Sequence, residues 1–302
     1  MSTAAQKWVP EETFRGSRIG LRRITLPNPS SHEVTIAVRA VGMNPVDALN
    51  LSGGAAEIGY EVSGTIVAVG NAVSAHDVGD DVLSFRVQGG YTTAITVPAK
   101  DVFAKPPHLG WAEAANLLLA GSAAAEMLYR TDIAAGDVVL VHGASGAVGI
   151  SAVQQAKLRG ARVIGTASQK NWPVLERFGA EPIAYGRGLE ERVRALTDHV
   201  DVALDAVGTD EAIDVSLALV DDRRRIASSN AFDRAGRDGF WIVGYESGSV
   251  EYRNKVRGNL VELAGTGKLV VPVARTFPFA EAPDALSLVA SGHAGGKVAL
   301  IV

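Results

Sequence analysis

A glycine-rich segment, Gly143-Ala144-Ser145-Gly146-Ala147-Val148-Gly149, offers the residue types that bind an anionic phosphate group. It follows an apolar run at 138–141 and leads into a helix-like segment at 147–159. Glycines let the backbone approach a ligand closely, and the free N–H groups and dipole at a helix start attract negative charge. A second apolar run at 162–166 arrives where a Rossmann unit has its second strand, so the pattern predicts a dinucleotide pyrophosphate site. The alternative is a tight strand–helix turn without a ligand.

The residues after that second strand bear on which dinucleotide is bound. NAD-binding Rossmann units carry an acidic residue at this point, which holds the ribose 2′-hydroxyl. The segment Thr166-Ala167-Ser168-Gln169-Lys170 has no carboxylate. The Ser168 hydroxyl and the Lys170 ammonium would instead receive a 2′-phosphate through charge-assisted hydrogen bonds. We therefore expect NADPH as the cofactor, with an ordinary surface lysine as the alternative for Lys170.

The absence of cysteine limits the chemistry that this chain can perform. With no cysteine among its residues, the chain lacks disulfides, thiolate nucleophiles, thiolate zinc sites and iron–sulfur clusters. The histidines show neither His-x-x-x-His nor His-Glu-x-x-His spacing, so each is predicted to be a surface or loop residue and not a ligand. They are His32, His76, His108, His142, His199 and His293. We expect no metal site, and the chemistry then comes from an organic cofactor or from oxygen and nitrogen side chains.

The elements that position these residues fall into two parts. The first hundred residues are β-rich, with alternating runs at 34–41, 62–70, 81–85 and 91–97 separated by glycine turns, as in a compact barrel-like domain. Residues 111–129 are rich in alanine and leucine and predict a helix that Gly121 interrupts. From residue 137 onward, strand candidates at 138–141, 163–166, 182–184, 200–204 and 225–227 alternate with helical patterns, which predicts a doubly wound parallel sheet. A helix at 251–266, a second at 281–291 and a closing strand at 297–302 complete the chain.

Composition excludes several classes of function. The chain has 302 residues, of which 47% are hydrophobic and 21% charged, which is typical of a globular protein of one large or two ordinary domains. The net charge of −4 provides no basic surface for nucleic acid or an anionic membrane. No apolar stretch is long enough to span a bilayer, and residues 1–10 lack the apolar core of a signal peptide. We therefore expect a cytoplasmic protein that binds neither nucleic acid nor membrane.

Eight segments along the chain, taken together, resemble those of the zinc-free quinone oxidoreductase branch of the medium-chain dehydrogenase/reductase superfamily, the zeta-crystallin-like proteins. The matching segments occur in family order and extend over nearly the whole chain. They are Gly42-Met43-Asn44-Pro45-Val46-Asp47, Gly59-Tyr60-Glu61-Val62-Ser63-Gly64, Val78-Gly79-Asp80-Asp81-Val82, Gly89-Gly90-Tyr91, Leu119-Ala120-Gly121, the stretch from Ala135 to Gly146, Asp205-Ala206-Val207-Gly208 and Gly296-Lys297-Val298.

The resemblance implies an α/β fold with two domains. A GroES-like β-barrel catalytic domain would comprise residues 1–112 and 268–302, and an NADP-binding Rossmann domain with a doubly wound parallel sheet would comprise residues 113–267. It also implies an active-site cleft between them, NADPH as hydride donor, a quinone or an α,β-unsaturated carbonyl compound as substrate, and a homodimer. Zinc-dependent relatives have a cysteine and a histidine where this chain has Asn44 and Tyr60, so the resemblance implies catalysis without zinc.

Site residues follow from the same resemblance. The pyrophosphate would lie against Gly143, Ala144, Ser145, Gly146, Ala147, Val148 and Gly149, and the 2′-phosphate against Ser168, Lys170 and Tyr185. A packed aromatic residue at a strand end is the alternative for Tyr185. Val207 and Lys297 would also lie near the cofactor.

Asn44 and Tyr60 are the candidates for catalysis. In the expected reaction negative charge collects on the substrate oxygen, and without a metal, hydrogen-bond donors must stabilise it. We expect the Asn44 amide to be that donor, with Tyr60 as a second candidate and a simple Asn-Pro turn as the alternative for Asn44. Asp47 and Glu61 are expected to orient loops or pair with a basic residue, with proton transfer as the alternative.

Two departures from the family pattern leave another function open. The segment at 52–58 is shorter than the usual loop before Gly59, and Ser122-Ala123-Ala124 lacks the usual threonine. A non-catalytic NADPH-binding sensor or structural protein is therefore the alternative. A short-chain dehydrogenase is disfavoured because the glycine turn comes late in the chain and no tyrosine precedes a lysine by four residues.

Overall fold

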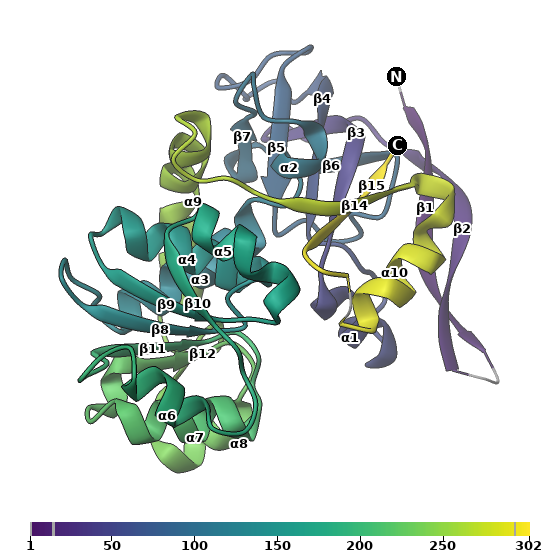
Figure 1. Cartoon of the computed structure of the whole chain (residues 1–302). Coiled ribbons are helices and arrows are strands. Elements are labelled where there is room, and N and C mark those ends of the chain that lie inside the picture. Colours follow the sequence, from purple (N-terminus) through teal and green to yellow (C-terminus); the bar gives the residue numbers. More distant parts are fainter. Residues whose placement is uncertain (1, 14–15, 293) are drawn as a thin grey trace. The chain divides into compact units, whose positions relative to one another are not determined.

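The computed structural model of this chain describes residues 2–13, 16–292 and 294–302, so His293 lies outside the described residues. The chain folds into two compact units (Figure 1). The first unit combines the part of the chain up to Leu119 with Val271–Val302, and the second unit is Ala120–Val270.

The first unit is built on a seven-stranded sheet and a long hairpin. The hairpin pairs β1 (Thr3–Thr13) with β2 (Gly16–Leu26) in antiparallel register. The sheet has the order β14-β15-β3-β4-β5-β7, and β6 pairs with β3. Its strands are β3 (Glu33–Met43), β4 (Glu61–Val69), β5 (Asp81–Phe85), β6 (Ala94–Pro98), β7 (Val102–Ala104), β14 (Val273–Pro278) and β15 (Lys297–Ile301). The helical segments of this unit are α1 (Pro45–Ser52), η1 (Ala99–Asp101), α2 (Trp111–Ala114), η4 (Phe279–Glu281) and α10 (Ala282–Ala290).

The alternation of large apolar residues with polar or small residues along the strands explains how this sheet covers its core. Residues of β3 such as Val34, Ile36 and Val38 are buried in one core cluster with Val62 and Ile66 of β4. This is the expected pattern for antiparallel strands that cover a core with one face. The unit is the GroES-like domain that the family resemblance implies, and it agrees with the β-rich character of this part of the sequence.

The second unit contains a parallel six-stranded sheet of order β10-β9-β8-β11-β12-β13. The strands are β8 (Val138–His142), β9 (Arg162–Thr166), β10 (Ala180–Ile183), β11 (Val202–Asp205), β12 (Ile226–Ser228) and β13 (Trp241–Ile242). The helical segments are α4 (Ala147–Leu158), η2 (Gln169–Asn171), α5 (Trp172–Arg177), α6 (Leu189–Arg194), α7 (Asp210–Leu219), η3 (Arg223–Arg225), α8 (Phe232–Asp238) and α9 (Ser249–Gly265), and α3 (Leu118–Arg130) lies almost wholly in this unit. Numbered from β8, the strand order is 3-2-1-4-5-6, which is the Rossmann arrangement.

Helices cover both faces of this parallel sheet (Figure 1). Val139 and Val141 pack in a cluster with residues of α3 and α4, whereas Leu140, between them, packs in another with residues of α6 and α7. A strand buried on both faces has a continuous apolar sequence, as the run at 138–141 does. The predicted doubly wound α/β fold is confirmed.

The structure corrects the prediction of one helix at 111–129 interrupted by Gly121. The break falls at residues 115–117, between α2 and α3, and Gly121 lies inside α3. A Cβ atom on Gly121 would lie 3.3 Å from a methyl carbon of Leu260 in α9. The glycine therefore allows a close helix–helix approach and does not end a helix.

Several elements had no clear signal in the sequence. The sequence patterns predict neither the hairpin β1–β2 nor the helices α1 and α8. Strand β13 has only two residues, too few for a recognisable pattern. Within the described residues, no helix combines the length and the apolar character that crossing a bilayer requires.

Candidate functional site

The glycine-rich turn joins β8 to α4 and leaves the start of that helix open. Gly143 has φ +66°, and its N–H donates to Thr166 Oγ1 at 3.1 Å. The turn closes through a hydrogen bond from the Gly146 N–H to the Gly143 carbonyl at 2.9 Å. Gly146 is the N-cap of α4, and no side chain caps the helix. Its first N–H groups have no intrahelical acceptors, so they fit an anionic pyrophosphate.

Close packing against the turn explains why position 149, in the first turn of α4, is a glycine. A Cβ atom on Gly149 would lie 2.2 Å from the Gly143 carbonyl oxygen and 2.7 Å from Ala144 Cα. Both of these atoms belong to the backbone and cannot swing aside as a flexible side chain would. Ala144 is fully buried, whereas Ser145, Ala147 and Val148 are half-buried.

Ser168 and Lys170 follow β9 at the carboxyl edge of the sheet. Ser168 is half-buried, and Lys170 is exposed in η2. Asn171, the last residue of η2, donates from Nδ2 to Ser145 Oγ at 3.1 Å. This bond links the segment expected to hold the 2′-phosphate to the turn expected to hold the pyrophosphate. The sequence alone did not indicate Asn171.

Tyr185 lies on the turn after β10, the strand next to β9 in the sheet. The Ala167 N–H donates to the Ile183 carbonyl at 3.0 Å, so the segments carrying Ser168 and Tyr185 leave the sheet side by side. Tyr185 is 60% exposed, which leaves its ring available to a ligand.

Two side chains hold the turn after β10 in place. The Arg192 guanidinium donates to the carbonyls of Ala184, Gly186 and Arg187 at 2.8 to 3.2 Å. Glu211 Oε2 accepts from the Gly186 N–H at 2.9 Å. Neither Arg192 nor Glu211 belongs to a motif, so no pattern in the sequence indicates this role for them.

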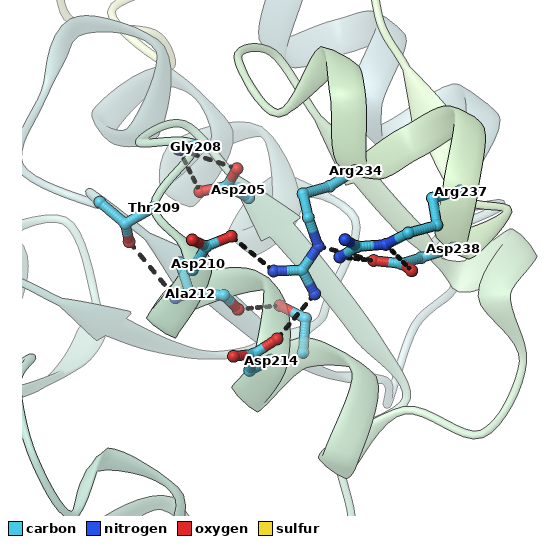
Figure 2. A network of polar contacts seen from close by, with 10 residues as sticks. Asp205, Gly208, Thr209, Asp210, Ala212, Asp214, Arg234, Arg237 and Asp238 are labelled. Carbon is cyan, nitrogen blue, oxygen red and sulfur yellow. Dashed lines mark hydrogen bonds and ion pairs between the residues drawn. The ribbon is translucent and has the colours of Figure 1, made fainter.

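Val207 lies on the turn after β11, which Asp205 organises. The buried Asp205 carboxylate accepts from the N–H groups of Val207 and Gly208 at 2.9 to 3.0 Å and from Ser228 Oγ at 2.6 Å. Figure 2 shows Asp205 bonded to Gly208, next to the start of α7. Val207 is 45% exposed.

An arginine of α8 holds the helix that follows this turn. Arg234 pairs with Asp210 and Asp214 of α7 and with Asp238 of its own helix, at 2.6 to 2.7 Å (Figure 2). Thr209 caps α7 by accepting from the Ala212 N–H at 3.3 Å. These contacts stabilise the start of α7, so the turn that carries Val207 is anchored at both ends.

His142 contradicts the prediction that every histidine is a surface or loop residue. It ends β8, is 1% exposed, and its Nε2 lies 3.1 Å from Ser216 Oγ. The Ser216 hydroxyl donates to the Ala212 carbonyl at 2.7 Å, so Nε2 of the neutral ring must be the donor in the other bond. Burial lowers the pKa of His142 to about 4, which keeps the ring neutral.

In the first unit, Asn44 and Lys297 meet in a buried polar cluster. Lys297 Nζ donates to Asn44 Oδ1 at 2.5 Å and lies 3.9 Å from Glu61 Oε1. Asp47 Oδ2 accepts from the Asn44 N–H at 2.8 Å and from the Tyr91 hydroxyl at 3.2 Å. Asn44, Asp47, Glu61, Tyr91 and Lys297 are at most 4% exposed, and we call them the buried cluster.

Burial dominates the electrostatics of the buried cluster. It raises the pKa of Asp47 to about 7, and it also raises the pKa of Glu61 and lowers that of Lys297. Asp47 Oδ1 accepts from the Gly59 N–H at 3.2 Å, and Glu61 Oε1 accepts from the Leu119 N–H at 3.1 Å. Asp47 and Glu61 therefore bond to loop backbone, and Glu61 lies beside a basic residue.

The two candidates for catalysis occupy different surroundings. Asn44 is 2% exposed, with Oδ1 bonded to Lys297 and Nδ2 lying 3.5 Å from Glu61 Oε1. Tyr60 is half-buried, and its hydroxyl oxygen accepts from Asn50 Nδ2 at 2.5 Å. The structure thus brings Asn44 together with Lys297, and Tyr60 together with a residue that the sequence did not single out. Across the described ranges, no group of three or more His, Cys, Asp or Glu side chains is arranged to hold a metal ion.

Comparison with known proteins identifies the family. Residues 30–107 match the alcohol dehydrogenase GroES-like domain, and residues 178–300 match the family described as zinc-binding dehydrogenase. The chain is 33% identical over 296 residues to the NADPH-dependent alkenal/one oxidoreductase, chloroplastic, of Arabidopsis thaliana, which covers 91% of this chain and 73% of that protein. The chain belongs to the medium-chain dehydrogenase/reductase superfamily. The predicted resemblance is confirmed.

Other relatives of this dehydrogenase/reductase chain include one much longer protein and two solved structures of similar length. It is 29% identical over 299 residues to phthioceranic/hydroxyphthioceranic acid synthase of Mycobacterium tuberculosis, and the match covers 90% of the chain but only 14% of the synthase. Among solved structures, the CurK enoyl reductase has a TM-score of 0.85 at 26% identity, covering 99% of this chain and 98% of that one. The quinone oxidoreductase from Coxiella burnetii has a TM-score of 0.79 at 26% identity, covering 99% and 100%.

Proposed function

We propose that this protein is an NADPH-dependent oxidoreductase that transfers a hydride to a quinone or to an α,β-unsaturated carbonyl compound without zinc. One observation carries the proposal: an uncapped helix start and a tight glycine turn lie beside a strand end that offers Ser168 and Lys170 but no carboxylate. The names of the Arabidopsis and Coxiella relatives support the substrate class.

The residues of the second unit fit the dinucleotide. When bound, NADPH supplies the hydride. The first turn of α4 would receive the pyrophosphate. Ser168, Lys170 and Tyr185 would bind the 2′-phosphate. The turn at Val207, held by Asp205, would support the cofactor from the next strand end in the sheet.

On the substrate side, the reaction needs a hydrogen-bond donor. Hydride adds to a substrate carbon, the electron pair of the double bond moves toward the oxygen, and a proton from water completes the reduced product. Since the Asn44 amide is already bonded to Lys297 and directed at Glu61, we assign the donor role to Tyr60. Asn44 and Lys297 then act in the buried cluster that supports Tyr60, and no metal takes part.

Assembly and location belong to the same proposal. We propose a cytoplasmic homodimer that acts on a small molecule and binds neither nucleic acid nor membrane. Light scattering of the purified chain, combined with size-exclusion chromatography, measures the oligomeric state, and a monomer at working concentration would contradict the dimer.

A non-catalytic NADPH-binding protein is the competing function, and the short segment before Gly59 favours it. The two differ in turnover, since a sensor or structural protein binds NADPH but does not consume it. NADPH oxidation should therefore be measured with a panel of quinones, enones and enoyl thioesters. Tight binding of NADPH with no oxidation by any acceptor would support the competing function.

The choice of NADPH over NADH depends on Lys170. Lys170→Ala should weaken NADPH binding about tenfold or more, because a charge-assisted hydrogen bond contributes about 1.5–3 kcal/mol, and it should leave NADH binding nearly unchanged. Fluorescence titration of both cofactors measures this, with Lys255→Ala on the exposed side of α9 as the matched control. Equal losses for NADPH and NADH in Lys170→Ala would contradict the assignment.

A further inference from the structure

We propose that Asn50 is a positioning residue that directs the Tyr60 hydroxyl hydrogen to the substrate oxygen. The inference rests on the proposed reductase function and adds a residue to it. Neither the glycine turn nor the family segments include Asn50.

The hydrogen bond between the two side chains sets the direction of the Tyr60 proton. Asn50 lies on α1 and donates from Nδ2 to Tyr60 Oη at 2.5 Å. A tyrosine hydroxyl has one hydrogen to donate, and an oxygen that accepts from an amide keeps that hydrogen for another partner. Both side chains are partly exposed, unlike the buried cluster. The Tyr60 O–H is thereby free to donate to a ligand.

The buried cluster holds both members of this pair. Asp47 lies in the first turn of α1, the helix that carries Asn50, and accepts from the N–H of Asn44 at the helix start. The same carboxylate accepts from the N–H of Gly59, directly before Tyr60. One buried carboxylate therefore fixes the helix of Asn50 and the backbone of Tyr60 relative to each other.

The backbone around Tyr60 has further support within the same unit. The Tyr60 carbonyl accepts from the Val87 N–H at 3.2 Å, and the Gly59 carbonyl accepts from the Gly90 N–H at 3.1 Å. On the other side, Glu61 belongs to the buried cluster. A donor fixed in this way is preorganised, so stabilising charge on the substrate oxygen costs little reorganisation.

Accepting a hydrogen bond also makes Tyr60 a stronger donor. Hydrogen bonds in a chain polarise one another, so the bond from Asn50 strengthens the bond that Tyr60 can donate. Removing one preorganised donor to a developing oxyanion lowers turnover by about 100-fold or more. Tyr60→Phe should show this loss.

Asn50→Asp is the decisive variant. It keeps the shape of the side chain but replaces the N–H donor with an acceptor, which takes the Tyr60 proton for itself. We expect kcat to fall about 100-fold, as in Tyr60→Phe, with NADPH affinity unchanged. Asn50→Ala removes the partner without trapping the proton and should lose only about 2- to 10-fold. The matched control is Asn71→Asp, on an exposed turn of the same unit.

The double variant Asn50→Asp/Tyr60→Phe tests whether the two residues act through one proton. The proposal requires it to be no slower than Tyr60→Phe alone, because the donor is already gone. Losses that multiply in the double variant, wild-type turnover in Asn50→Asp, or an equal loss in Asn71→Asp would each overturn the assignment. If the unmodified protein fails to oxidise NADPH with every acceptor of the panel, the proposed function is refuted, and this inference is refuted with it. If the unmodified protein is active and the Asn50→Asp variant is equally active, only this inference is refuted and the proposed function stands.

Discussion

Replacing Gly149 by alanine tests whether the glycine turn is shaped by close backbone packing. The added Cβ atom would lie 2.2 Å from the Gly143 carbonyl oxygen and 2.7 Å from Ala144 Cα. A carbon atom normally stays about 3.3 Å from a carbonyl oxygen, so the start of α4 and the turn must separate by about 1 Å. Because both contacts involve backbone, no side-chain rotation relieves them.

The expected size of the effect follows from two opposing terms. Alanine in place of glycine inside a helix stabilises it by about 1 kcal/mol. Overpacking at a rigid site costs about 1–3 kcal/mol, and a contact of this length lies at the upper end. We expect Gly149→Ala to lower the free energy of unfolding by about 1–2 kcal/mol. The displaced turn should also weaken NADPH binding about tenfold, equivalent to one charge-assisted hydrogen bond.

Gly258→Ala is the matched control in the same unit. Gly258 lies in α9, is exposed, and a Cβ atom there would meet nothing within 4 Å. Only the helix-propensity term remains, so this variant should gain about 0.5–1 kcal/mol and bind NADPH normally. Urea unfolding and fluorescence titration measure both quantities. If Gly149→Ala were as stable as Gly258→Ala and bound NADPH equally well, the reasoning from close backbone approach would be wrong.

Three further variants test other parts of the molecule. Arg192→Ala should weaken NADPH binding about 2- to 10-fold by releasing the turn of Tyr185, and unchanged affinity by fluorescence titration would contradict this role. Burial raises the pKa of Asp47 from 3.8 to about 7, so between these pH values the folded chain retains a proton on Asp47 that the unfolded chain releases. The free energy of unfolding should therefore fall by up to about 1.4 kcal/mol per pH unit as the pH rises from 4 to 7, and urea titrations of Asp47→Asn should show a smaller fall. Burial lowers the pKa of His142 from 6.5 to about 4. The contribution of the neutral His142 ring to the free energy of unfolding is therefore fully present above pH 6.5 and is lost as the pH falls to 4. This loss of about 3 kcal/mol should be absent in His142→Gln, and an unchanged acid profile in thermal melts would count against it.

The nucleotide-binding fold could be predicted from the sequence because its signals are local. An apolar run buried on both faces, a glycine turn and a helix start lie within about twenty consecutive residues, as they do around Gly143. The absence of a carboxylate after β9 is also visible in the sequence. The hairpin β1–β2 escaped prediction because its strands bury little apolar surface and carry many charged residues, so alternation is weak.

The partners of the polar side chains were decided only by tertiary structure. The sequence predicts Asn44 as a hydrogen-bond donor to the substrate, but it does not show that the Asn44 amide oxygen bonds Lys297, 253 residues further along the chain. The link between Asn50 and Tyr60, and the burial of His142, likewise depend on which elements the sheets bring together. Periodicity and turn residues determine where strands and helices form, because those preferences act between near neighbours. Hydrogen-bond partners and burial depend on contacts between distant segments, and such contacts exist only once the chain has folded.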